Sequence, residues 1–213
     1  MNNNPVRYND PTGHQANSND GAGNARGGSE CNTETNTDSS GNTCHDYEVT
    51  SPVCLNLPWI DCTAEEVANY MSRFQYPGQW PGSPVVDGDE RNVAPAEVWG
   101  FPTPLCYMGM CDSGTITVDV AENNPLSIDN ITQPSHIFDN GDVLRTSSQD
   151  ANGSWSVTTH GSGSNNGYGI LPGHLIDQVN QRIGPVVFKA VDLQLVAYTT
   201  VAETWQFVTS FFH

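Results

Sequence analysis

The spacing of apolar residues divides the chain into a helix, a strand-rich middle part and a helical C-terminal part. A helix is predicted to begin at Thr63, an N-cap whose capping box is completed by Glu66. Four apolar residues then recur at helical spacing, namely Val67, Tyr70, Met71 and Phe74. Pro77 and Gly78 end this helix, and we interpret its apolar face as part of the core.

From residue 114 onward the period changes to that of β-strands. Residues 114–120 alternate apolar and polar side chains, and residues 125–134 continue the alternation. The segments 141–149 and 154–163 are predicted to pair as a hairpin, because the Asn-Gly turn signal lies in the "DANG" between them.

The C-terminal part is predicted to form two helices. The first covers 175–183 and ends at Gly184, and Pro185 opens the second, which covers 185–212. One apolar stripe runs along both: Ile176, Val179, Ile183, Val187, Val191, Leu195, Tyr198, Ala202, Trp205 and Val208. Polar residues interrupt it, so these helices are predicted to be amphipathic and not to span a membrane.

Together these elements predict one α+β module over residues 46–213. A small antiparallel sheet would pack with the capped helix and the two C-terminal helices, and long irregular loops such as 77–111 would join them. Residues 15–45 are rich in Asn, Gly, Ser and Thr and nearly free of apolar side chains, which predicts a flexible linker.

The first residues, "NNNPVRYNDPTGH", carry a turn signature in which proline fixes φ and glycine permits positive φ. Pro5 and the run Asp10, Pro11 and Gly13 make this stretch similar to the end of the Rhs/YD-repeat core. His14 stands where that family often has Leu, which leaves open whether the family's self-cleavage occurs here.

The Rhs resemblance implies that residues 1–14 are a remnant of the repeat core and that the variable C-terminal module follows. In that family this module is often a toxin delivered to neighbouring cells. The resemblance therefore implies that the chain is secreted and extracellular as part of a larger protein. The opening residues of this chain do not have the pattern of a signal peptide. Its implied partners are the parent Rhs shell and either an immunity protein or a cell-surface target.

Charge narrows the classes of partner. The chain has 7 Lys and Arg against 24 Asp and Glu, a formal net charge of −17. A protein this acidic repels phosphate backbones and anionic membrane surfaces, so we expect no nucleic acid among its partners.

Six cysteines occur, an even number that suits an oxidising compartment and up to three disulfides. Their local spacing favours Cys31–Cys44, Cys54–Cys62 and Cys106–Cys111, although fifteen pairings are formally open. Their spacing does not match a zinc motif.

The candidate catalytic residues are His136, Arg145, His160 and Asp192. The hairpin could bring His136, Arg145 and His160 together, with His160 as a general base oriented by Asp192 or Asp142 and with Ser162 or a cysteine as nucleophile. The segments "PSHIFDNGDVLRT" and "GSWSVTTHGSGSN" also resemble a recurring C-terminal module of secreted bacterial proteins, a resemblance that implies no activity.

The same residues also have a structural interpretation, which the sequence favours over the catalytic one. The two histidines would then hydrogen-bond loop backbone, and Arg145 would pair with Asp142 or Asp192. The polar loop with Gly161, Gly163, Asn165 and Asn166 could hold an anion through its backbone N–H groups.

Two further kinds of site remain alternatives. Cys62 precedes the helix that begins at Thr63, where the dipole would lower the pKa of its thiol, so it is an alternative nucleophile paired with His160. No resident cofactor is expected, although two acidic runs offer oxygen ligands that could hold calcium. These runs contribute Asp87, Asp89 and Glu90, and Asp139 and Asp142.

Two functions are predicted from these features. The first is a C-terminal effector or toxin-type module of a secreted Rhs-like protein that acts in competition between bacteria, with its chemistry undetermined. The alternative is a non-enzymatic extracellular binding or adhesion module. The charge, the predicted disulfides and the lack of a clean catalytic motif favour the alternative.

Overall fold

The computed structural model describes residues 31–32, 34–54, 59–60, 62–93, 97–98, 101–102, 114–121, 126–133, 136, 141–165 and 172–210. The Rhs-like motif of residues 1–14, the pair Cys106 and Cys111, and Asp139 and Asn166 lie outside this part of the chain.

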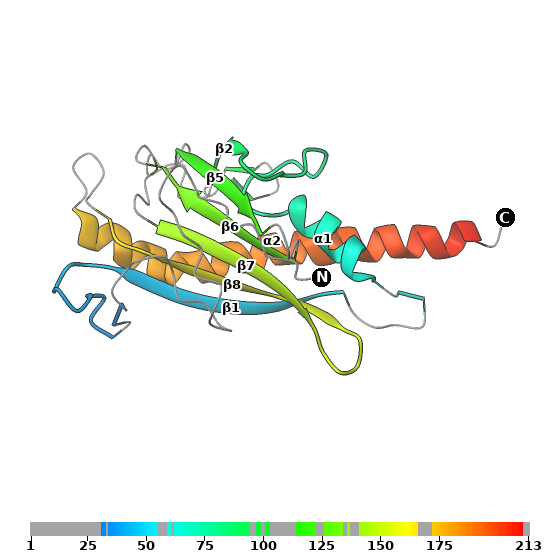
Figure 1. The fold of residues 1–213 in the computed structure, drawn as a ribbon, viewed down its shortest axis with the longest axis horizontal. Helices are drawn as coiled ribbons and strands as arrows, with labels where there is room; N and C mark the ends of the chain where they lie inside the picture. Colours follow the sequence, from blue (N-terminus) through cyan, green and yellow to red (C-terminus); the bar gives the residue numbers. More distant parts are fainter. Residues whose placement is uncertain are drawn as a thin grey trace, which may run out of the picture.

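Six antiparallel strands form the main sheet in the order β1-β8-β7-β6-β5-β2 (Figure 1). Their bounds are β1 His45–Cys54, β2 Glu90–Asn92, β5 Thr115–Val120, β6 Ser127–Thr132, β7 Gly141–Gln149 and β8 Trp155–Gly163. A separate two-stranded pair consists of β3 Glu97–Val98 and β4 Phe101–Pro102. The α+β class and the antiparallel sheet predicted from the sequence are confirmed.

The predicted hairpin is present as β7 and β8, which pair from Gly141 opposite Gly163 to Gln149 opposite Trp155. The Asp150 N–H donates to the Ser154 carbonyl oxygen at 2.9 Å, and Gly153 adopts a φ of 86° in the turn. Glycine is required there because side chains with a Cβ rarely adopt this conformation.

Strand β1 is an element that the sequence analysis missed. Its alternate residues His45, Tyr47 and Val49 are buried, while Pro52 interrupts the strand-like run. The backbone N–H of Asp46 turns to the free edge of the sheet, where it donates to Gln181 Oε1 of the long helix at 2.7 Å. Pro52 lies an even number of residues after Asp46, so its backbone nitrogen points to the same side of the strand, toward the free edge. Proline has no N–H to donate, but at this position no hydrogen bond between strands is lost.

Helix α1 spans Ala64–Ser72 and begins with the predicted capping box. The Glu66 N–H donates to Thr63 Oγ1 at 3.2 Å, and the Thr63 N–H donates to Glu66 Oε2 at 2.8 Å. The predicted apolar face is buried, and the Tyr70 hydroxyl donates to the buried Glu203 at 2.8 Å. This bond ties α1 to the C-terminal helix.

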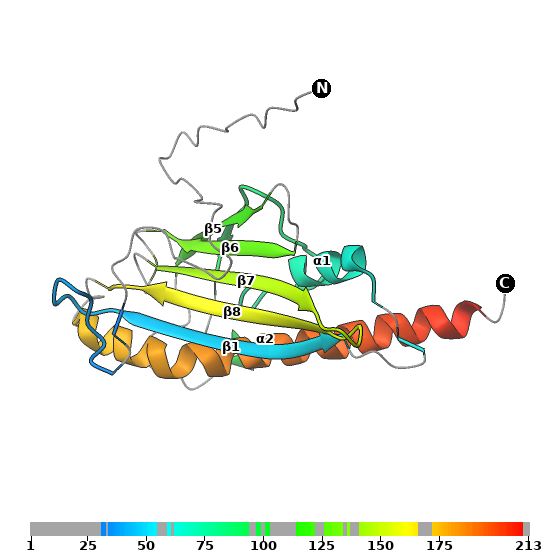
Figure 2. The ribbon, with the colours of Figure 1, turned by 60° about the horizontal axis from the view of Figure 1, so that its bottom comes forward.

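The two predicted C-terminal helices form one continuous helix, α2, over Gly173–Ser210. It runs along one face of the sheet beneath β1 and continues past the end of the sheet (Figure 2). Pro185 lies inside it and removes one intrahelical donor. The helix continues because packing of its inner face on β1 stabilises it on both sides of the proline.

Three residues of the predicted apolar stripe of α2 are buried, namely Ile176, Val191 and Leu195. Val179, Ile183 and Val187 are partly buried, and Trp205 near the C-terminal end is 68% exposed. By length and composition α2 could cross a membrane, and it is the one such helix among the residues described. Its inner face buries Asp177, Asp192 and Glu203 against the rest of the fold, so we interpret it as a helix that packs on the sheet.

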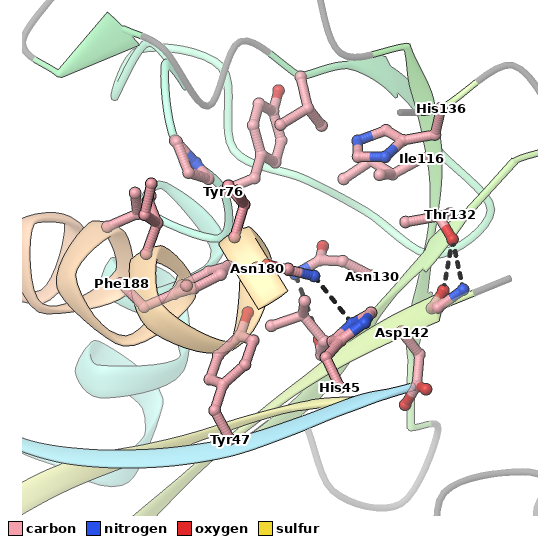
Figure 3. Close-up of a pocket in the computed structure, with 18 residues that line it drawn as sticks. His45, Tyr47, Tyr76, Ile116, Asn130, Thr132, His136, Asp142, Asn180 and Phe188 are labelled. Atoms are coloured by element: carbon pink, nitrogen blue, oxygen red, sulfur yellow. Dashed lines mark hydrogen bonds between the residues drawn. The ribbon is translucent and has the colours of Figure 1, made fainter. Parts of the chain in front are cut away.

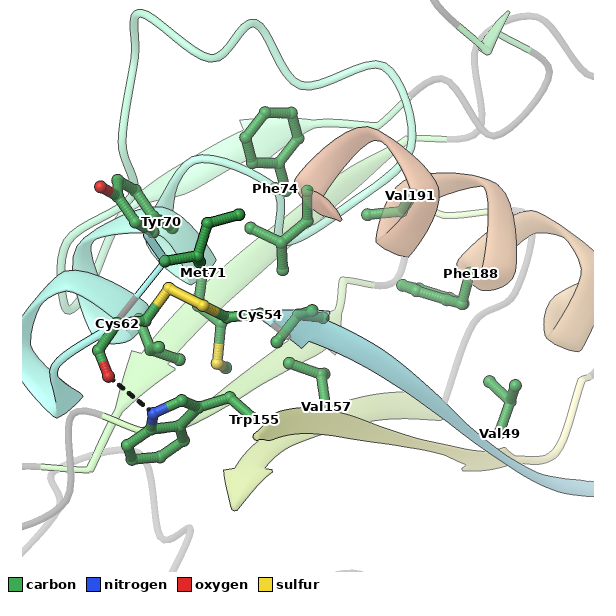
Figure 4. Packing of buried hydrophobic residues seen from close by; sticks show 14 of the residues in the cluster. Val49, Cys54, Cys62, Tyr70, Met71, Phe74, Trp155, Val157, Phe188 and Val191 are labelled. Atoms are coloured by element: carbon green, nitrogen blue, oxygen red, sulfur yellow. Dashed lines mark hydrogen bonds between the residues drawn. A yellow bond between two sulfur atoms is a disulfide. The ribbon is translucent and has the colours of Figure 1, made fainter. Parts of the chain in front are cut away.

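The main core lies where α1, β1, β8 and α2 meet (Figure 4). Trp155 fills one end of it, and its indole N–H donates to the Cys62 carbonyl oxygen at 2.9 Å. Met71 and Val157 are completely buried there.

Two of the predicted disulfides, Cys31–Cys44 and Cys54–Cys62, are confirmed. The first closes the turns that precede β1, and the second links the end of β1 to the start of α1 inside the core. Disulfides persist in oxidising compartments, so they indicate an extracellular or otherwise secreted location.

Candidate ligand-binding site

A cavity lies between the N-terminal half of α2 and the face of the sheet formed by β1, β7, β6 and β5 (Figure 3). Apolar side chains make most of its wall: Val93, Ile116, Val143, Val179, Val187 and Phe188. Counting its opening to solvent, it encloses about 770 Å³ of empty space. The volume of the cavity itself is about 70 Å³. The cavity therefore has room for a small ligand.

Tyr47 of β1 lies beside the cavity in a slot made by two glycines. A Cβ at Gly161 of β8 would lie 2.3 Å from Tyr47 Cζ, and one at Gly184 of α2 would lie 2.4 Å from Tyr47 Cε1. Glycine at these two positions lets the tyrosine ring lie between strand and helix. Burial, and secondarily the charge of Asp142, raises the pKa of Tyr47, so its hydroxyl stays neutral.

A buried polar network closes the wall near the start of β1. His45 Nδ1 lies 2.8 Å from Asp177 Oδ1, and Asn180 Nδ2 lies 2.8 Å from His45 Nε2. Because the Asn180 amide nitrogen is a donor, His45 Nε2 accepts, and the ring proton is assigned to Nδ1. Asp177 also accepts from the backbone and side-chain N–H groups of Asn165. The network joins β1 and the loop after β8 to the first turns of α2.

Asn130 lies on β6 with its side chain buried at 3% exposure. Its Nδ2 donates to the Gln75 carbonyl oxygen at 3.1 Å and lies 3.5 Å from the Val143 carbonyl oxygen. Its Oδ1 has no hydrogen-bond partner among the described residues.

Of the predicted catalytic residues, His136 is the one that lines this cavity. The predicted orienting residue Asp142 contributes to the wall, but its carboxylate accepts from Ser162 Oγ at 3.0 Å. Side chains alternate along a strand, so Asp142 points to the sheet face opposite Arg145. Figure 3 shows the Asp142 carboxylate pointing away from the cavity.

Arg145 and Asp192 are brought together as a salt bridge that is completely buried. The guanidinium also donates to Thr159 Oγ1 at 3.1 Å and to the Phe74 carbonyl, and it lies 5.6 Å from the centre of the Phe188 ring. Burial lowers the pKa of Arg145, and the negative charge of Asp192 counteracts this shift. Burial raises the pKa of Asp192, and the positive charge of Arg145 counteracts that shift. This arrangement matches the structural interpretation of the pair given above.

His160 lies apart from the other three candidates. Its neighbour Thr159 faces Arg145, so His160 points to the opposite face of β8, where its Nε2 lies 3.2 Å from Asp46 Oδ1. Cys62, the alternative nucleophile, is disulfide-bonded to Cys54 and carries no thiol in this state.

The structure thus assembles a different polar set at the cavity, with His45, Asn130 and Asn180 in place of Arg145 and His160. A signal for it exists in the sequence. Asp177, Asn180 and Gly184 recur at helical spacing beside the apolar stripe, which indicates polar groups on a buried face. Their partner His45 is found by the fold alone, because it lies 135 residues from Asn180.

Among the described residues, no group of three or more His, Cys, Asp or Glu side chains is placed to hold a metal ion. Two of the predicted calcium ligands bond to the protein. Asp87 accepts from the Val120 N–H at 3.0 Å, and Asp89 accepts from the Val86 N–H and the Arg91 guanidinium. Backbone hydrogen bonding, followed by the bond from Arg91, lowers the pKa of Asp89.

No family model matches the chain, and no curated protein matches it. Among solved structures, the chain is similar to the crystal structure of Ara h 8.0201, with a TM-score of 0.37 and 11% sequence identity. The match covers 72% of this chain and 99% of that one.

Proposed function

We propose that the chain is an extracellular binding module that holds a small, largely apolar molecule in the cavity between α2 and the sheet. The observation that supports this most is the composition of the wall, which is apolar except for a few polar groups held in place by other residues. Small-molecule sites are commonly built in this way. The disulfides and the acidic surface suit a protein that works outside the cytoplasm.

Two tryptophan substitutions on neighbouring positions of α2 test this proposal. Val187 lines the cavity, whereas Val186 is 66% exposed. We expect Val187→Trp to fill the cavity and weaken binding of single-ring probes such as phenol and toluene by at least about tenfold, a loss of about 1.4 kcal/mol. Val186→Trp should bind as the unmodified chain does. Titrations followed by NMR measure both.

Binding of neither probe by the unmodified chain would contradict the proposal. So would equal binding by the two variants, because the site would then lie elsewhere. Thermal unfolding of each variant without probe serves as the control that both remain folded.

The second candidate is the C-terminal effector of an Rhs-like protein, delivered with its parent shell and neutralised by an immunity protein. It is favoured by the motif at Pro5, Asp10, Pro11 and Gly13. The two candidates differ in their effect on cells, because an effector must harm its target whereas a binding module need not.

Inducible expression of the full chain in bacteria, once in the cytoplasm and once directed to the periplasm, separates the two. The effector function predicts growth arrest in at least one compartment, and arrest in the periplasm alone would indicate a target in the cell envelope. The binding module predicts normal growth in both with soluble protein produced. If arrest occurs, His136→Ala and His160→Ala test whether either histidine is needed.

A further inference from the structure

We infer that two copies of this chain associate through the solvent-facing side of α2, with the two helices antiparallel and related by a two-fold axis at Ala197. The surface shares no residue with the cavity wall, so the association is separate from the proposed binding of a small molecule. Three observations support it: the exposed apolar residues of α2, their symmetric spacing and the placement of the charges on the helix.

The solvent-facing side of α2 carries an apolar stripe of its own. Five residues form this outer stripe, namely Val186, Leu193, Ala197, Val201 and Val208. All five are exposed, and the four larger side chains are between 41% and 70% exposed. At 3.6 residues per turn they lie within about 40° of one line along the helix. A helix that is apolar on two opposite faces is expected to be covered on both, and the part of the chain that the structure describes covers only the inner one.

The outer stripe has the same spacing in both directions from Ala197. Leu193 and Val201 lie four residues before and after it, and Val186 and Val208 lie eleven residues before and after it. In an antiparallel pair with its axis at Ala197, Leu193 of each copy therefore lies beside Val201 of the other. Val186 meets Val208 in the same way, and the two small Ala197 side chains allow the helices to approach closely. Two-fold contacts of this self-complementary kind are the commonest in symmetric oligomers.

The charges of α2 leave this surface free of carboxylates. The acidic residues of the helix are Asp177, Asp192 and Glu203, and all three are buried on its inner face. Its exposed charged residues are Arg182 and Lys189, both on the N-terminal side of Ala197. An antiparallel pair keeps the cations of one copy away from those of the other. Two chains of net charge −17 can therefore meet at the outer stripe without placing carboxylates against each other.

The antiparallel arrangement also covers the end of α2 that continues past the sheet (Figure 2). Trp205 and Val208 belong to this end and are exposed. In the pair, the projecting end of each copy lies along the N-terminal half of α2 in the other. A lipid surface would also cover these apolar side chains, but it gains nothing from spacing that is symmetric about Ala197. The spacing therefore favours a second copy of the chain.

Sedimentation equilibrium of the full chain tests for this association. We expect a monomer–dimer equilibrium that Leu193→Glu weakens at least about tenfold, because each dimer would then remove two carboxylates from water without a partner. Ser148→Glu adds the same charge at an exposed position of β7 and should weaken it less than about twofold. Added sodium chloride should strengthen the dimer, since salt screens the repulsion between two acidic chains.

Cross-linking locates the two-fold axis. Ala197→Cys places one thiol from each copy at the axis, so a mild oxidant should join the two chains of a dimer by a disulfide. Lys189→Cys is the matched control on the same helix. In the antiparallel pair its two thiols lie about 24 Å apart along the helices, at a rise of about 1.5 Å per residue, so it should cross-link much more slowly.

Four results would overturn the inference. A chain that remains monomeric at about 1 mM does not associate as described. Equal cross-linking through positions 189 and 197 would place the contact elsewhere. Weaker association in added salt would indicate that the cations of α2 bind carboxylates on another face. Binding to vesicles of neutral lipid without self-association would assign the outer stripe to a membrane surface. None of these results bears on the proposed function of the cavity.

Discussion

Replacing Arg145 by Met is expected to lower the free energy of unfolding by about 3–5 kcal/mol at neutral pH, the usual effect of removing one partner of a buried ion pair. The substitution leaves Asp192, which is 1% exposed, without its cation. It also removes donors to Thr159 and to the Phe74 carbonyl. Since small domains are stable by about 5–15 kcal/mol, this loss is a large part of the total. Urea unfolding measures it.

The effect of Arg145→Met should depend on pH. Burial already raises the pKa of Asp192 and the Arg145 charge opposes that rise, so in the variant the carboxyl pKa rises further. When the pKa of a group is higher in the folded chain than in the unfolded chain, the folded state loses stability as the pH rises from the lower to the higher of these two pKa values. The deficit of the variant should therefore be larger at pH 8 than at pH 4.

Two control variants separate the loss of the pair from the loss of a charge. Arg182→Met removes an exposed arginine from α2 and should change stability by less than about 0.5 kcal/mol. The double variant Arg145→Met, Asp192→Leu replaces both partners by apolar side chains and should recover much of the loss. If Arg145→Met alone unfolds at the same urea concentration as the unmodified chain, the pair does not stabilise the fold as argued.

Replacing both Cys54 and Cys62 by Ala is expected to cost about 2.5 kcal/mol, the loop-closure contribution of a disulfide that spans eight residues. Both cysteines are buried in the main core, so lost packing adds to this value. The disulfide also places the Cys62 carbonyl that accepts from Trp155. Thermal and urea unfolding under non-reducing conditions measure the loss.

The matched control replaces Cys31 and Cys44, which close a slightly longer loop outside the main core. The loop-closure contribution is similar, but Cys31 and Cys44 do not belong to the main core cluster, so less packing is lost and this pair should cost less overall than Cys54 and Cys62. A larger loss for the outer pair would contradict the assignment of Cys54–Cys62 to the core.

The position of α2 links these stability predictions to the cavity. Arg145 and Asp192 join β7 to α2 next to Phe188, which also lines the cavity. The network of His45, Asp177 and Asn180 joins β1 to the same helix nearer its start. These two polar connections, together with Tyr47 between Gly161 and Gly184, set how far α2 lies from the sheet and so determine the space left for a ligand.

The sequence by itself determined the elements whose signals are local. The capping box at Thr63, the Asn-Gly turn between β7 and β8, and the two short-range disulfides each involve groups within fifteen residues of one another, so their chemistry can be read from spacing. The same alternation predicted the strands from 114 to 163.

The tertiary structure decided what depends on contacts between distant residues. Pairing with β8 and burial under α2 make β1 a strand despite Pro52, and packing on the sheet keeps α2 continuous through Pro185. Among the candidate residues, the fold buried Arg145 with Asp192, turned His160 to the other face, and placed His45 and Asn130 at the cavity. Local spacing fixes which face of its own element a side chain occupies, but which elements meet there depends on how the whole chain buries its apolar surface.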